Sequence, residues 1–102
     1  MKIINDETYE LAAAEWQYQM ILILKSALEK HGVEKFKLKD ICGDFAFDLA
    51  MLQDQGEIKL DGKELRPVIC FEDPEGSLKY NSINQSQIHD YAFGNVGEAF
   101  GE

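Results

Sequence analysis

The chain has 102 residues, 45% of them hydrophobic, and its 19 Asp and Glu outnumber its 10 Lys and Arg, which gives a formal net charge of −9. This length suits one domain with one hydrophobic core, so we predict a single domain over residues 1–102. The acidic excess is spread along the chain and leaves no basic surface for nucleic acid or anionic lipid. It favours a basic protein surface as the partner.

The first predicted element is a long helix. Apolar residues recur there at spacings of three and four: Tyr9, Ala12, Trp16, Met20, Ile23 and Ala27. Acidic residues near the start and Gly32 at the end set its limits at about 6–31. Residues 20–24 are apolar all round, so this half should be buried on most sides. One function class follows, a homo-oligomeric accessory or structural protein in which the face from Trp16 to Leu24 pairs with a second copy.

A second helix is predicted over about 39–55. Its apolar positions are Ile41, Phe45, Leu49 and Leu52, and Gly56 closes it. The preceding segment 33–38 alternates apolar and charged residues, which indicates a short strand or an extended lead-in. Gly43 lowers helix propensity by about 1 kcal/mol relative to Ala, so a break into two short helices is the alternative. The polar face carries Asp40, Asp44, Asp48 and Asp54.

Three strands are predicted in the second half. Segments 57–60 and 64–71 flank Asp61-Gly62, a strong hairpin signal because both turn positions of the favoured turn need a positive φ. Pro67 lacks an N–H and should lie on an edge or at a bulge. Segment 73–76 is a second turn, and 77–83 can be a third strand.

The last predicted element is a short helix over 85–93, capped by Asn84. At its end Ala92-Phe93-Gly94 is echoed by Ala99-Phe100-Gly101. This pattern indicates a Gly-rich tail, either docked through its two Phe side chains, frayed, or binding a partner with them. The fold class is therefore α+β: a long N-terminal helix, a second helix, a small antiparallel sheet of two to three strands, and a short C-terminal helix or tail.

The order of elements over 36–71, a helix followed by a two-stranded ribbon, resembles the second half of a winged helix-turn-helix module. The resemblance covers about a third of the chain and rests on no specific motif. Because the corresponding recognition surface is acidic here, the resemblance implies contact with protein rather than reading of DNA.

Motifs for catalysis, cofactors and metals are lacking in the sequence. His31 and His89 stand singly, and Cys42 and Cys70 have no CxxC spacing, so we expect no metal, no cofactor and no enzyme activity. Two buried free thiols are expected, with a disulfide between them as the alternative. There is no signal peptide pattern, and the longest apolar run is far shorter than the ~20 residues that span a bilayer. We therefore expect a cytoplasmic location and no membrane contact.

The predicted site is an acidic patch for a basic partner. Its residues are Asp40, Asp44, Asp48, Asp54 and Glu57. Stacked like charges on a helix repel one another, and a cationic partner relieves that repulsion. The leading hypothesis is a small non-catalytic protein-binding module, in the form of an inhibitor or immunity protein that masks the basic site of a nucleic-acid enzyme or toxin.

Overall fold

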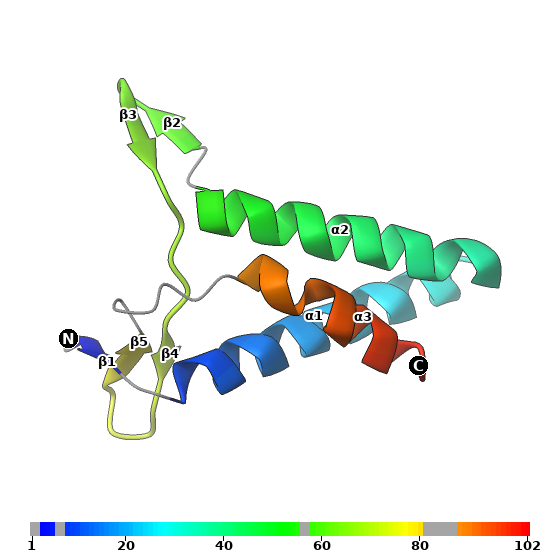
Figure 1. The fold of residues 1–102 in the computed structure, drawn as a ribbon, viewed down its shortest axis with the longest axis horizontal. Coiled ribbons are helices and arrows are strands. Elements are labelled where there is room, and N and C mark those ends of the chain that lie inside the picture. The colour runs from blue at the N-terminus through cyan, green and yellow to red at the C-terminus, as the bar shows by residue number, and fades with distance from the viewer. Residues whose placement is uncertain (1–2, 6–7, 56–57, 81–87) are drawn as a thin grey trace.

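The computed structural model describes residues 3–5, 8–55, 58–80 and 88–102, and its fold is shown in Figure 1. Three helices contact one another pairwise and make up the larger part of the molecule. The elements in chain order are β1 (Ile3–Asn5), α1 (Tyr9–Lys30), α2 (Lys35–Gln55), β2 (Ile58–Leu60), β3 (Lys63–Leu65), β4 (Phe71–Glu72), β5 (Leu78–Tyr80), the 3-10 turn η1 (Ile88–Tyr91) and α3 (Ala92–Ala99). The predicted α+β class is confirmed.

Helix α1 contacts both α2 and α3. Its buried side differs from the predicted apolar stripe: the buried residues are Tyr9, Ala13, Gln17 and Ile21, and of the six predicted positions only Tyr9 is among them. Ile21 is fully buried, and Met20, Leu22 and Leu24 pack against the core around it. Ile23 is the exception in this apolar run, since it is 71% exposed. The helix ends where the sequence indicates, because Gly32 adopts a left-handed φ of +79° and its N–H closes the last turn on the Glu29 carbonyl.

Helix α2 differs from the prediction in its start and in the side that it buries. It begins at Lys35, so the strand predicted over 33–38 is wrong, and it continues through Gly43 without a break. Its buried side consists of Leu38, Cys42, Ala46 and Ala50, while Ile41, Phe45 and Leu52 are exposed. Small side chains allow close approach of α1 and α3, which explains why the helix turns this side inward. The core cluster comprises Ile21, Cys42, Ala46, Ala92, Val96 and Ala99.

The strands form two separate sheets rather than one. β2 and β3 pair as the predicted hairpin, in which Asp61 and Gly62 both have positive φ values, 51° and 75°. β4 pairs antiparallel with β5, and β1 adds to β5 in parallel, a pairing that the sequence did not predict. The strand predicted over 64–71 is broken, because residues 66–70 cross from one sheet to the other (Figure 1). Residues 81–83 of the predicted third strand lie outside the described residues.

The C-terminal segment is a helix, not a tail. Residues 84–87 of the predicted helix lie outside the described residues, and from Ile88 the chain forms η1 and then α3. Phe100 packs against the core, and the Lys25 ammonium lies 4.7 Å from its ring centroid and donates to the Ala99 carbonyl. A cation at this position satisfies the carbonyls that the end of a helix leaves free. Phe93 is 71% exposed, with its ring 5.5 Å from that of Phe47.

Candidate functional site

Three of the predicted acidic residues form one row on the outer side of α2. Asp40, Asp44 and Asp48 follow one another at intervals of four residues, and all three are exposed. At this spacing each carboxylate lies one helical turn from the next. The prediction that these three share a solvent-facing side is therefore confirmed.

A row of large apolar side chains lies beside the acidic row. Ile41, Phe45 and Leu52 are 36%, 46% and 39% exposed. On a helix with 3.6 residues per turn these three positions fall within a narrow stripe, and Asp48 and then Asp44 border it on one side. We call the two rows together the α2 outer face; its residues are Asp40, Ile41, Asp44, Phe45, Asp48 and Leu52. A contiguous exposed apolar patch that polar residues border is one of the features that mark protein contact surfaces.

Positive charge bounds the α2 outer face at the start of the helix. Lys37 is exposed, and its ammonium lies 5.7 Å from the centroid of the Phe36 ring, which is itself 72% exposed. Lys39 forms an ion pair with Glu102. Asp44 and Asp48 therefore lie farther along α2 from these ammonium groups than Asp40 does.

Asp54 does not belong to the exposed row. Its side chain is 6% exposed, and its carboxylate accepts hydrogen bonds from the backbone N–H groups of Ile88 and His89 at 3.2 and 2.9 Å. The ring Nδ1 of His89 lies 2.6 Å from the same carboxylate. Asp54 therefore holds the start of η1 in the way that a capping residue holds a helix start. Glu57, the fifth predicted site residue, lies outside the described residues.

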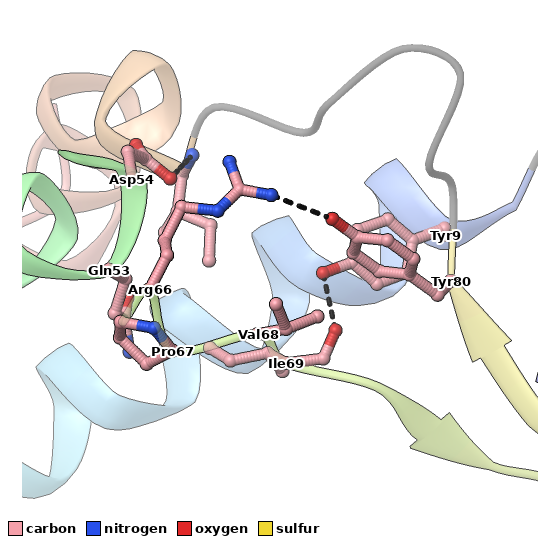
Figure 2. A pocket seen from close by; sticks show the side chains of 9 residues that line it. Tyr9, Gln53, Asp54, Arg66, Pro67, Val68, Ile69 and Tyr80 are labelled. Atoms are coloured by element: carbon pink, nitrogen blue, oxygen red, sulfur yellow. Dashed lines mark hydrogen bonds between the residues drawn. The ribbon is translucent and has the colours of Figure 1, made fainter. Parts of the chain in front are cut away.

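A second polar cluster surrounds a small cavity at the end of α2 (Figure 2). Tyr9 donates to the Ile69 carbonyl at 2.6 Å, and Arg66 donates to the hydroxyl of Tyr80 at 3.2 Å. The cavity is about 20 Å³, enough for about one water molecule and too small for a substrate. Burial raises the pKa of Tyr9 to about 12, and the neighbouring Tyr80 adds to the shift. Tyr9 is therefore a neutral hydrogen-bond donor at physiological pH.

Two of the groups weighed for catalysis, His89 and Cys42, have surroundings that the structure describes in detail. His89 lies between two carboxylates, with its Nε2 3.3 Å from Asp90. Both cysteines are free, as predicted, but only Cys42 is buried, whereas Cys70 is partly exposed. Burial raises the pKa of the Cys42 thiol, which disfavours a thiolate there. Among the described residues no three His, Cys, Asp or Glu side chains gather in a way that could hold a metal ion.

The sequence did not reveal the exposed apolar row. Its spacing is that of a buried helix face, and the predicted apolar positions were Ile41, Phe45, Leu49 and Leu52. Of these four only Leu49 is partly buried, and the other three are exposed. The competing pattern of Leu38, Cys42, Ala46 and Ala50 recurs every four residues, which is also a helix spacing, and three of its four side chains are small. The sequence also did not indicate that Asp54 lies inside, because the pairing with Ile88 and His89 joins residues more than 30 positions apart.

Comparison with known proteins gives no relative. No protein-family model matches the chain, and neither a curated protein nor a solved structure is detectably similar to it. The winged helix-turn-helix resemblance is thus limited to the order of a helix and a hairpin. Within the described part of the chain, no helix has the length and apolar character needed to cross a bilayer.

Proposed function

We propose that the protein is a non-catalytic binding module whose α2 outer face docks on a basic protein surface. The observation that supports this is the pairing of an exposed acidic row with an exposed apolar row on one side of α2. Charge accelerates the encounter with a cationic surface, while buried apolar anchors supply much of the affinity. Phe45, the largest and most exposed side chain of the apolar row, is the proposed anchor.

The concrete form of the proposal is an inhibitor or immunity protein for a nucleic-acid enzyme or toxin. Such enzymes hold their substrate in a cationic cleft, because the phosphate backbone dominates nucleic-acid binding. A rigid acidic helix can occupy that cleft and exclude the substrate. The net charge of −9 favours the same class of partner at longer range and at low salt.

The partner surface would contact Asp40, Asp44 and Asp48 directly. Asp54 would not contact the partner, because its carboxylate accepts hydrogen bonds inside the protein from the N–H groups of Ile88 and His89. It keeps η1 and the end of α2 in place and thereby supports the face. In this form the proposal keeps three of the five predicted residues as contacts.

The test compares two double variants with the same loss of charge. Asp44→Asn/Asp48→Asn removes two carboxylates from the α2 outer face, and Glu10→Gln/Glu98→Gln removes two exposed ones from other helices. Proteins captured from the native host's lysate at low salt are identified, and the captured protein is then purified and titrated against each variant. We expect the first variant to bind about tenfold more weakly at low salt, with the difference shrinking as salt screens the charges.

Folding is expected to survive these changes. Removing one of two stacked like charges relieves a repulsion of a few tenths of a kcal/mol, so the Asn variant should be as stable as the parent or slightly more stable. Equal binding by both double variants would show that the acidic row is only a solvated surface. A captured protein without a basic surface would contradict the inhibitor form of the proposal.

A further inference from the structure

The β2–β3 hairpin has an apolar face that is exposed in the described part of the chain. The register pairs Ile58 with Leu65 and Leu60 with Lys63, so these four side chains lie on one face. Lys59 and Glu64 are paired on the opposite face. All six residues are exposed. Among the apolar ones, Ile58 is 42%, Leu65 is 44% and Leu60 is 60% exposed.

The hairpin extends beyond the end of α2, away from the three helices and from the other sheet (Figure 1). A two-stranded hairpin on its own is at best marginally stable in water, and both of its strands are free edges. An apolar face on such an element needs a partner surface for its stability. The hairpin therefore has the features of a docking arm.

We propose that this arm docks on the α2 outer face of a second copy of the same chain. The two surfaces are complementary in chemistry. The arm presents three apolar side chains and the ammonium of Lys63, while the α2 outer face presents three apolar side chains beside Asp44 and Asp48. In a symmetric dimer each copy gives one arm and receives one, so the contact occurs twice.

Charge favours a second copy over a basic partner as the occupant of the arm. Residues 58–66 contain Lys59, Lys63 and Arg66 against Asp61 and Glu64, a balance of +1 in a chain whose formal net charge is −9. A basic protein would be repelled by this segment and attracted by α2. A second copy offers the arm its α2 outer face, which combines acidic residues with an apolar row.

The hairpin strands are shorter than the apolar row of α2, so the row is long enough to receive them. Strands of three residues span about 10 Å, and the apolar row from Ile41 to Leu52 extends over about 16 Å of helix. The arm can therefore lie along the row. The inference goes beyond the proposed function and does not rest on it, but the two share the α2 outer face, so self-association and partner binding compete.

The test is the mass of the purified protein in solution, measured by analytical ultracentrifugation. The protein concentration is varied from about 5 to about 500 µM, which is on the order of the range in which weak dimers form. We expect a concentration-dependent dimer. Leu60→Ser and Phe45→Ser, one on each side of the contact, should each weaken it at least tenfold. Ile23→Ser is the matched control, because this exposed residue lies on α1 and outside the contact.

Charge reversal makes the assignment specific. Lys63→Glu and Asp48→Lys should each weaken the dimer, and the double variant should restore it to within a few-fold of the parent, since the pair is then reversed in both copies. Far-UV circular dichroism checks that every variant folds, and Ile58→Thr replaces Leu60→Ser if that variant does not. No partner is present in these measurements, so their result is independent of the proposed function.

Three outcomes would overturn the inference. The first is a monomer at every concentration. The second is a dimer that Ile23→Ser dissociates and Leu60→Ser does not, which would place the contact on α1. The third is a double charge reversal that associates no better than either single variant.

Discussion

The two sides of α2 use their side chains in opposite ways. On the inner side Cys42, Ala46 and Ala50 are small and at most 1% exposed, whereas Phe45, a large apolar residue, is 46% exposed on the outer side. The inner side contributes to stability by allowing neighbouring helices to approach closely. The large outer residues Ile41, Phe45 and Leu52 lie outside the core cluster, and under the proposed function they are the apolar part of the contact surface.

The aspartates of α2 show the same division. Asp44 is exposed on the outer side, while Asp54 accepts two backbone hydrogen bonds and a contact from His89 on the inner side. Equal residue types on one helix thus have different roles, which depend on what lies opposite them. The predictions below contrast inner positions with outer ones, or buried groups with exposed ones, and run from the largest expected effect to the smallest.

The strongest contrast is expected between neighbouring positions 45 and 46. Ala46→Leu inserts a larger side chain where α2 packs on the core cluster, and overpacking at a fully buried site should cost about 3 kcal/mol. Phe45→Leu on the outer side should change stability by less than about 0.5 kcal/mol. Urea unfolding at 25 °C measures both. Similar losses for the two variants would mean that the two sides of α2 do not differ as described.

The second contrast concerns Asp54 and Asp44. Asp54→Ala leaves the N–H groups of Ile88 and His89 without their acceptor, so we expect a loss of about 2 kcal/mol in the free energy of unfolding. Asp44→Ala removes one of several stacked charges, and its effect should stay within about 0.5 kcal/mol. Both values come from the same urea titration. A loss below about 0.5 kcal/mol for Asp54→Ala would show that the η1 cap is not an important contact.

Local patterns in the sequence predicted the local parts of the fold. The Asp61-Gly62 hairpin and the glycine end of α1 follow from backbone rules that act within a few residues, and both were found where predicted. The side of α2 that is buried could not be derived in this way. Two stripes of the same period compete there, and the choice depends on α3, which contributes Ala92, Val96 and Ala99 from the other end of the chain.

Of the candidate site, the sequence predicted the exposed row of Asp40, Asp44 and Asp48 but not its setting. Carboxylates spaced four residues apart lie on the same side of a helix, so this row can be predicted without knowledge of the tertiary contacts. The apolar row beside them and the internal position of Asp54 depend on contacts distant in sequence. The parallel pairing of β1 with β5 was missed for the same reason, since it joins residues that are 75 positions apart, such as Ile3 and Leu78.

The smallest effect, and the one with a pH signature, is expected at Tyr9. Its side chain is almost fully buried and donates to the Ile69 carbonyl, so Tyr9→Phe should cost about 1 kcal/mol at pH 7. Tyr80→Phe loses an exposed hydrogen bond to Arg66 and should cost less.

The pKa of Tyr9 rises from 10.0 to about 12 on folding, mainly through burial. Below pH 10 the folded and unfolded chains both hold this proton. Between pH 10 and about 12 only the folded chain holds it, so stability falls as the pH rises through this window. Tyr9→Phe should lose this part of the alkaline decline and Tyr80→Phe should retain it, which urea unfolding at pH 7, 9, 10 and 11 can measure; the same decline in Tyr9→Phe as in the parent would assign the alkaline sensitivity to other groups.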